Sequence, residues 1–165
     1  MISLAANLLP MISLVSGNMF DCQVDALVNT VNCVGVMGAG VALQFKMRYP
    51  EMFQDYVRRC RAGMVRPGQP YEWRPEESLF GSDSRIVINF PTKDDWRNPS
   101  QYSYIESGLQ WLRQYLLQSP DLSIAIPALG CGYGGLDWPV VEAMIRSTLG
   151  DLENDILLFP PQPRR

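Results

Sequence analysis

Short apolar runs alternate with longer segments of helical periodicity along most of the 165-residue chain. The runs are rich in Val, Ile and Leu and are bounded by Gly, Pro, Asn or Asp, a pattern that predicts β-strands. Residues 74–84 are mostly polar, which predicts a solvated loop between two of these strands. The expected strands lie at about residues 11–15, 25–29, 69–73, 85–90, 123–127 and 155–159.

Four segments between these runs repeat apolar residues every three or four positions, which predicts amphipathic helices. Ser100 is the expected N-cap of the third helix and Asp137 that of the fourth, because both side chains can accept a hydrogen bond from the first turn. Residues 160–165 follow the last strand and are expected to fray. The expected helices lie at about residues 39–48, 50–62, 101–118 and 138–149.

The alternation of strands and helices predicts the fold class. Helices that connect the strands of one sheet cover both of its faces, so we expect a three-layer α/β/α sandwich with a mostly parallel centre. With 47% hydrophobic residues, the chain can bury the core of one domain. We therefore expect residues 1–165 to form a single domain whose core lies at about residues 11–159.

Composition and charge narrow the possible functions. No apolar run reaches the roughly 18 residues that span a bilayer, and no basic region precedes the apolar N-terminal segment, so neither a membrane partner nor a signal peptide is expected. The net charge of −3 argues against a broad electrostatic surface for nucleic acid, although it leaves contact with one nucleotide open. Four cysteines without Cys-x-x-Cys spacing favour a reduced, cytoplasmic protein.

The chain contains no histidine. This excludes Ser-His-Asp and Cys-His catalysis and leaves few credible zinc ligands. Any catalysis must therefore come from Lys, Asp, Glu, Tyr, Cys or the ligand itself, and we expect neither a metal nor a cofactor.

Two glycine-rich turns carry most of the functional information. The first glycine loop, residues 35–40, and the second glycine loop, residues 130–135, each follow an expected strand and precede an expected helix. Glycine lets backbone N–H groups converge on a bulky anion, and the helix N-terminus behind each loop adds partial positive charge. Two such loops in one small domain predict a site that holds a diphosphate.

Each loop has a plainer interpretation when taken alone. Either one can be a simple connector between a strand and a helix. Gly130, Gly132 and Gly135 match G-x-G-x-x-G, but the motif stands late in the chain and no acidic partner follows it, which disfavours a NAD-type oxidoreductase. No Lys-Ser/Thr pair follows Gly40, so the first loop is not a Walker A loop.

Several polar residues lie where strands of the expected sheet end. Asn29 and Asn32 flank the end of one strand, where Asn either caps a turn or contacts a ligand; the two interpretations are balanced for Asn29, and a ribose contact is favoured for Asn32. Lys93 follows the strand at 85–90 and should lie at the same edge, unless it is a solvated lysine beside two aspartates. Trp96 and Arg97 either stack on a substrate base or anchor their own loop.

Three segments, residues 28–46, 88–93 and 127–138, together resemble a macrodomain, and the resemblance extends over about residues 11–159. More narrowly, they resemble the macrodomain of the DarG-type DNA ADP-ribosyl glycohydrolase antitoxins and a relative, the terminal ADP-ribose protein glycohydrolase. The resemblance implies a macrodomain fold with a mixed, mostly parallel six-stranded sheet that binds ADP-ribose across its carboxyl edge.

The resemblance also implies which residues form the site. Lys93 and Asn32 are the implied catalytic residues, and Asn32 contacts the distal ribose. Residues 36–41 hold part of the diphosphate and the distal ribose, and residues 129–134 close over the other side. The implied ligand-binding residues are Asn18, Met19, Phe20, Asn32, Val36, Met37, Gly38, Ala39, Gly40, Val41, Pro91, Thr92, Leu129, Gly130, Cys131, Gly132, Tyr133 and Gly134.

Two positions depart from the family pattern. Asn18 stands where most macrodomains have an aspartate that recognises the adenine amino group, which implies weaker adenine preference. Gly134 stands where the protein-directed relative has an acidic catalytic residue, as in the DNA-directed type. This difference favours adducts of nucleobases over adducts of acidic protein side chains.

These features predict an ADP-ribosyl glycohydrolase that removes ADP-ribose from modified DNA bases in single strands, with ADP-ribosylated protein as a second substrate. Lys93 would act either as an amine nucleophile or, when protonated, as an acid. The alternative is a non-catalytic module, either a reader that binds ADP-ribose or a metabolite-binding module, which would not need Lys93. We expect a monomer.

Overall fold

The computed structural model describes residues 12–76 and 83–163. Its six strands form one sheet in the order β1-β6-β5-β2-β4-β3. All neighbours pair in parallel except β3, which runs antiparallel to β4 at one edge. The mixed, mostly parallel sheet is thus confirmed. The strands are β1 (Ile12–Leu14), β2 (Ala26–Val31), β3 (Tyr71–Trp73), β4 (Ile86–Pro91), β5 (Ile124–Ile126) and β6 (Ile156–Leu158).

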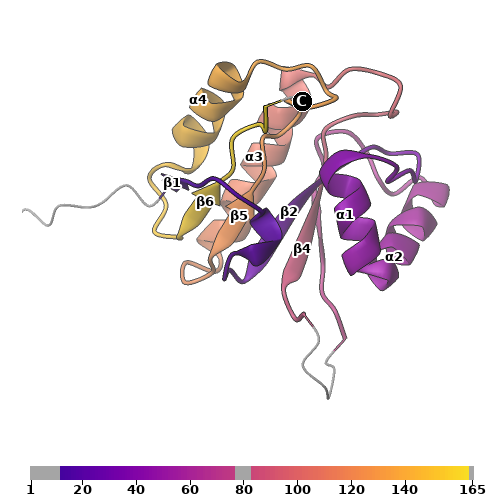
Figure 1. The fold of residues 1–165 in the computed structure, drawn as a ribbon, viewed down its shortest axis with the longest axis horizontal. Coiled ribbons are helices and arrows are strands. Elements are labelled where there is room, and N and C mark those ends of the chain that lie inside the picture. The colour runs from indigo at the N-terminus through magenta and orange to yellow at the C-terminus, as the bar shows by residue number, and fades with distance from the viewer. Residues whose placement is uncertain (1–11, 77–82, 164–165) are drawn as a thin grey trace, which may run out of the picture.

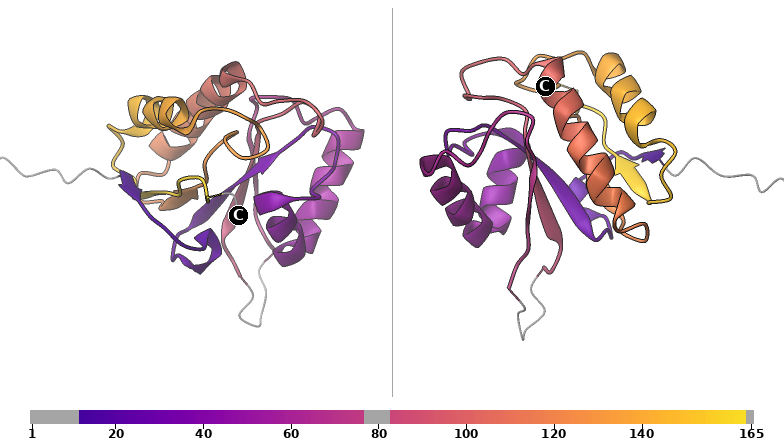
Figure 2. Two further views of the ribbon diagram at one scale, coloured as in Figure 1. Left: turned by 45° about the horizontal axis from the view of Figure 1, so that its top comes forward. Right: turned by 180° about the vertical axis from the view of Figure 1, so that it is seen from behind.

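Four α-helices cover the two faces of this sheet. They are α1 (Gly40–Arg48), α2 (Pro50–Arg61), α3 (Tyr102–Leu117) and α4 (Trp138–Leu149). The helices α1 and α2 lie on one face, and α3 and α4 lie on the other, which confirms the three-layer sandwich (Figures 1 and 2). None of the helices in the described part of the chain is long and apolar enough to cross a membrane.

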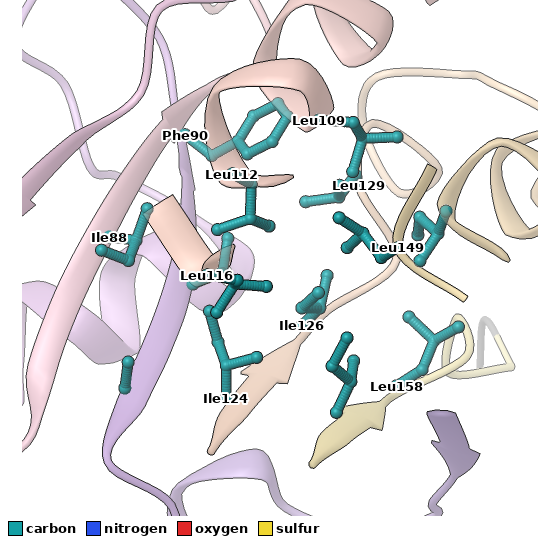
Figure 3. Close-up of a cluster of buried hydrophobic side chains, with 14 of the residues drawn as sticks. Ile88, Phe90, Leu109, Leu112, Leu116, Ile124, Ile126, Leu129, Leu149 and Leu158 are labelled. Atoms are coloured by element: carbon teal, nitrogen blue, oxygen red, sulfur yellow. The ribbon is translucent and has the colours of Figure 1, made fainter. Parts of the chain in front are cut away.

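Alternate residues of each central strand supply two separate cores, because successive side chains of a strand point to opposite faces. In β4, Ile88 and Phe90 pack against α3 and α4, whereas Val87 faces α1 and α2. Figure 3 shows the first of these cores, in which Leu109 and Leu112 of α3 meet the strands. Every residue of β4 is buried, as expected for a strand covered on both faces.

The helix starts follow the sequence prediction only in part. Asp137 is the N-cap of α4, as expected, although its side chain makes no capping hydrogen bond. The prediction of Ser100 as N-cap of α3 is wrong, because Gln101 holds that position. The Ser100 N–H instead donates to the carbonyl oxygen of Gly134 at 3.0 Å, so this residue is held against the second glycine loop and the helix begins later.

Three expected segments include residues outside the described part of the chain. Of the predicted loop at 74–84, residues 77–82 lie outside them, as do residue 11 of the first predicted strand and residues 164–165 of the predicted frayed tail. The described part of that tail, residues 160–163, does not fray away from the domain, since it forms part of the wall of a cleft.

The order of the strands places several loops at one edge of the sheet. Strand β2 lies between β5 and β4, and Val31 at its end pairs with Pro91 at the end of β4. The loops that follow the carboxyl ends of β2, β4, β5 and β6 therefore converge. This is the edge at which open α/β sheets bind ligands.

Helix α3 lies close against β4 at Gly108, and we predict that Gly108→Ala will destabilise the fold. A methyl group at Gly108 would lie 2.1 Å from Cζ of the buried Phe90 ring. Alanine favours a helix by about 1 kcal/mol over glycine, but overpacking a core costs about 1–3 kcal/mol and a clash this close lies at the upper end. Urea denaturation should show a net loss in the free energy of unfolding.

The matched control is Gln110→Ala, two positions further along α3 on its exposed face. This change should alter the free energy of unfolding by less than about 0.5 kcal/mol, as exposed substitutions usually do. Equal stability of the Gly108→Ala variant and the wild type would contradict the close packing of α3 on β4.

Candidate functional site

A cleft of about 1300 Å³ opens at the carboxyl edge of the sheet. Most of the predicted site residues lie in its wall. Three of them do not, because Met37, Pro91 and Leu129 are buried behind the wall. The predicted residues that line the cleft are Asn18, Met19, Phe20, Asn32, Val36, Gly38, Ala39, Gly40, Val41, Thr92, Lys93, Gly130, Cys131, Gly132, Tyr133 and Gly134.

The cleft also contains residues that the sequence did not indicate. Gln44 of α1, Thr30 of β2 and Pro127 after β5 contribute to its wall, as does the segment 159–163 that follows β6. At the start of that segment, the N–H of Phe159 donates to the carbonyl oxygen of Ile126 in β5 at 2.9 Å. This bond extends the pairing of β5 with β6 by one residue. Proline-rich residues at a chain end are typical of a mobile tail, so no local signal marked this segment.

The first glycine loop is held in shape by the side chain of Asn32. Its amide oxygen accepts from the N–H groups of Val34 at 3.1 Å and Val36 at 3.4 Å, and its amide nitrogen donates to the carbonyl oxygen of Val36 at 2.7 Å. The Tyr56 hydroxyl of α2 donates to the same amide oxygen at 2.7 Å. Asn32 therefore sets the conformation of the loop, and its direct contact with a ribose stays a prediction.

The other asparagine of this strand is structural. Asn29 is fully buried and donates to the side-chain oxygen of Asn89 at 3.1 Å on the neighbouring strand. Asn89 in turn donates to the hydroxyl of Tyr71 at 3.0 Å. This row of polar side chains crosses three strands beneath the first glycine loop, and Asn29 does not line the cleft.

The start of α1 faces the cleft and suits an anion. Gly40 begins the helix, Ala39 is its N-cap without a side-chain hydrogen bond, and the first turn carries no acidic residue. The N–H groups at a helix start carry partial positive charge and bind phosphate well when no carboxylate competes for them. The first glycine loop and α1 thus provide one half of a diphosphate site.

Lys93 lies between the loops that follow β4 and β5. Its Nζ donates to the carbonyl oxygen of Trp96 at 3.3 Å and to that of Tyr133 at 3.1 Å. No ion pair among the described residues involves Lys93, and Asp95 pairs instead with Arg97. Lys93 is therefore held by backbone carbonyl oxygens beside the two aspartates, and burial lowers the pKa of its ammonium below the ordinary value.

The two cysteines nearest to Lys93 are poor nucleophiles. Cys33 donates its thiol proton to the carbonyl oxygen of Lys93 at 3.3 Å, and burial raises its pKa to about 12. Cys131 lines the cleft, and burial raises the pKa of its thiol to about 11. Because the thiolate is the reactive form of cysteine, Lys93 is the better candidate for chemistry in this cleft.

The second glycine loop has room for a side chain at one glycine and none at another. A Cβ at Gly134 would lie 2.4 Å from the carbonyl oxygen of Gly130 and 2.3 Å from the Ser100 Oγ. A Cβ at Gly132 would meet no atom within 4 Å. The tight turn thus excludes any side chain, including an acidic one, at position 134 in this conformation.

The two glycine loops meet across the mouth of the cleft. Tyr133 is 78% exposed, and its ring lies against Gly40 at the start of α1, where an added Cβ would be 3.5 Å from Tyr133 Cε2. Gly40 also has a φ of +58°, a conformation that glycine adopts at little cost. The positive φ is therefore the reason for glycine at position 40, because a Cβ there would only be in ordinary contact with the tyrosine ring.

Asn18 shapes the other end of the cleft. Its side-chain oxygen accepts from the N–H of Phe20 at 2.9 Å and caps a short 3₁₀ helix at Met19–Asp21. The guanidinium of Arg48 packs over the Phe20 ring at 4.5 Å. The local turn uses one acceptor site of Asn18, and its contact with adenine stays a prediction.

Comparisons with known proteins agree with this geometry. A family model described as Macro domain matches residues 28–145. A DNA ADP-ribosyl glycohydrolase of Mycobacterium tuberculosis is 45% identical over 152 residues, which cover 92% of this chain and 42% of the relative. The chain spans less than half the length of the curated bacterial relatives that it matches at 35–45% identity.

Two solved structures resemble the fold closely. The macrodomain of Mycobacterium tuberculosis DarG has a TM-score of 0.83 at 44% identity, with 93% of this chain and 99% of that chain covered. Thermosipho africanus DarTG in complex with ADP-ribose has a TM-score of 0.84 at 35% identity, with 93% of this chain and 42% of that chain covered.

The contact between Tyr56 and Asn32 gives a testable consequence for the first glycine loop. We predict that Tyr56→Phe will lower the free energy of unfolding by about 1 kcal/mol, the usual value of one hydrogen bond. It should also weaken ADP-ribose binding several-fold, because the loop loses one of the groups that hold Asn32. Calorimetric titration with ADP-ribose measures the second effect.

Tyr49→Phe is the matched control. Tyr49 is also buried, and its hydroxyl donates to Asp83 at 2.6 Å, a residue outside the cleft. This variant should lose comparable stability and keep its affinity for ADP-ribose. Equal affinities of both variants would show that Tyr56 does not support the ligand site through Asn32.

Proposed function

The chain belongs to the Macro domain family, and on this premise we propose that it is an ADP-ribosyl glycohydrolase that releases ADP-ribose from a modified base of DNA. The observation that carries the proposal is the position of Lys93. Its amine is held at the junction of the two glycine loops by two backbone carbonyl oxygens and has no carboxylate partner among the described residues. The names of the bacterial relatives support the same activity.

The proposed ligand follows the shape and charge of the cleft. The diphosphate lies against the first glycine loop and the N-terminus of α1, and residues 130–134 close over it. The adenine lies toward Asn18 and Phe20, and the distal ribose lies toward Asn32 and Lys93. This arrangement brings the anomeric carbon of the distal ribose to the only cationic side chain in the described wall of the cleft.

The proposed reaction breaks the bond between that anomeric carbon and the base, and it consumes one water. The water oxygen ends on the anomeric carbon, and a proton ends on the base that leaves. As an ammonium, Lys93 donates a proton or hydrogen bond to the leaving group. As a neutral amine, it attacks the carbon as the bond breaks, and water then releases the sugar from nitrogen.

The acidic residue of the protein-directed relative has no counterpart at Gly134, where a side chain does not fit. This supports a nucleobase adduct as the preferred substrate, with ADP-ribosylated protein as the weaker one. The expectations of a monomer and of a cytoplasmic location stay predictions from the sequence.

We predict that Lys93→Ala will lower the hydrolysis of an ADP-ribosylated oligonucleotide by about 10²- to 10⁴-fold, the usual contribution of a positioned proton-transfer group. The affinity for ADP-ribose should stay within a few-fold, because the two loops carry most of the binding. Single-turnover assays and calorimetry measure the two quantities. The chain has only one other lysine, Lys46 in α1, so Lys46→Ala is the matched control and should keep full activity.

The pH dependence of the wild type separates the two roles of Lys93. If the neutral amine reacts, the rate rises with pH and levels off above the pKa of Lys93, which burial places below the ordinary value. If the ammonium reacts, the rate is highest at low pH and falls through the same pKa. A fully active Lys93→Ala variant would exclude both roles of Lys93. A wild type that binds ADP-ribose but hydrolyses no adduct would instead leave a module that only binds ADP-ribose.

Gly132→Glu tests the binding site itself. A side chain at Gly132 has room, so the variant should fold, and its carboxylate would lie in the cleft where the diphosphate is proposed to bind. We predict that repulsion between like charges lowers ADP-ribose affinity by at least about 10-fold, or about 1.4 kcal/mol. Gly132→Ala adds only the methyl group and should bind normally. An unchanged affinity of the glutamate variant would place the diphosphate elsewhere.

A further inference from the structure

Trp96 is an exposed aromatic side chain at the mouth of the cleft. It is 54% exposed and belongs to the loop that carries Lys93. An indole ring exposed to this extent leaves apolar area in water that burial would favour. A flat apolar ring next to a reactive group is a suitable surface for a flat ligand.

Several hydrogen bonds hold the loop of Trp96 in place. The N–H of Cys33 donates to the carbonyl oxygen of Asp94 at 2.9 Å, and the Lys93 ammonium donates to that of Trp96. The Arg97 guanidinium lies 5.5 Å from the centre of the Trp96 ring and is itself held by Asp95 through bonds of 2.9 and 2.7 Å. The ring is therefore presented on an ordered loop, which lowers the entropic cost of binding.

The position of Trp96 relative to Lys93 decides what the ring can touch. Lys93 Nζ lies 3.3 Å from the backbone carbonyl oxygen of Trp96, and both residues line the cleft, so Trp96 is a neighbour of the place proposed for the reacting carbon. ADP-ribose itself ends at that carbon. With the ribose and diphosphate on the inner side of the cleft, as proposed above, the group attached to that carbon extends toward the mouth, where Trp96 lies.

The charges around Trp96 favour a base over a nucleic-acid backbone. Lys93 is the only cationic side chain in the described wall of the cleft, and Asp95 neutralises the guanidinium of Arg97. A protein that binds the phosphates of a nucleic-acid backbone needs several cationic side chains along the binding groove, and the net charge of this chain is −3. Stacking of a base on an aromatic ring does not need these cations.

We propose that Trp96 stacks on the nucleobase that carries the ADP-ribose, and that the chain recognises its substrate through this one base. The proposal rests on the proposed glycohydrolase function. It means that an ADP-ribosylated nucleoside is about as good a substrate as an ADP-ribosylated single strand. It also means that added salt affects both substrates equally, because no further phosphates are bound.

The test compares Trp96→Ala, Trp96→Phe and the wild type on an ADP-ribosylated nucleoside and on the same adduct in an oligonucleotide. We expect Trp96→Ala to lower kcat/KM on both by about 10- to 100-fold, the range for loss of one stacked base. The loss should appear mainly in KM, and Trp96→Phe should recover most of it. Affinity for ADP-ribose should stay within two-fold. Met64→Ala, an exposed apolar side chain outside the cleft, is the control and should behave as the wild type.

The possible failures are distinct. A wild type that releases ADP-ribose from neither nucleobase adduct overturns the proposed function. An active wild type whose Trp96→Ala variant is equally active, or loses ADP-ribose affinity in the same proportion, overturns the stacking proposal alone. A ratio of oligonucleotide to nucleoside kcat/KM that falls steeply with salt also overturns it, because it shows backbone recognition. The stacking proposal is also overturned if Trp96→Ala loses the same factor in kcat/KM on an ADP-ribosylated glutamate peptide, because that substrate has no base at the reacting carbon.

Discussion

The cleft depends on one cation that two backbone carbonyl oxygens share. Lys93 connects the loop after β4 to the second glycine loop after β5, although β2 separates these strands in the sheet. Carbonyl oxygens carry only partial charge, so they position the ammonium without neutralising it as a carboxylate would. The amine therefore keeps both its attraction for an anionic ligand and, because burial lowers its pKa, access to the neutral form. A carboxylate in the same place would raise that pKa and favour the ammonium.

Different contacts hold each glycine loop in its own conformation. The position of one loop relative to the other is then set by the sheet and by Lys93. The first loop is held from within by Asn32, which Tyr56 of α2 supports. The second is held from behind, where Ser100 at the start of the α3 segment binds the backbone of Gly134. These contacts join each loop to a helix on a different face of the sheet. The three-layer fold is thus what places two ordered halves of a ligand site opposite each other.

Much of the fold could be predicted because buried runs such as β4 and the apolar faces of the helices are strong local patterns. The elements that the sequence missed or misplaced depend on distant partners. Ser100 has the chemistry of an N-cap, but a contact with Gly134, 34 positions later, takes precedence. Asn32 could be placed at the site from its position, whereas its hold on the loop needs Tyr56 from another helix. The contribution of residues 159–163 to the cleft has no local signal at all.

The tight turn of the second glycine loop also limits which groups of the cleft can take part in the reaction. Because Gly130 and Ser100 occupy the space beside Gly134, the loop contributes backbone and no acid near the reacting carbon. The two nearby thiols are held in their protonated form by burial. Lys93 is then the one cationic side chain in the described wall, and burial lowers its pKa below the ordinary value. A single such group gives little means of distinguishing one leaving group from another. Discrimination between substrates must therefore come from surfaces outside the reacting centre, and Trp96 is the exposed aromatic ring on the loop that carries Lys93 itself.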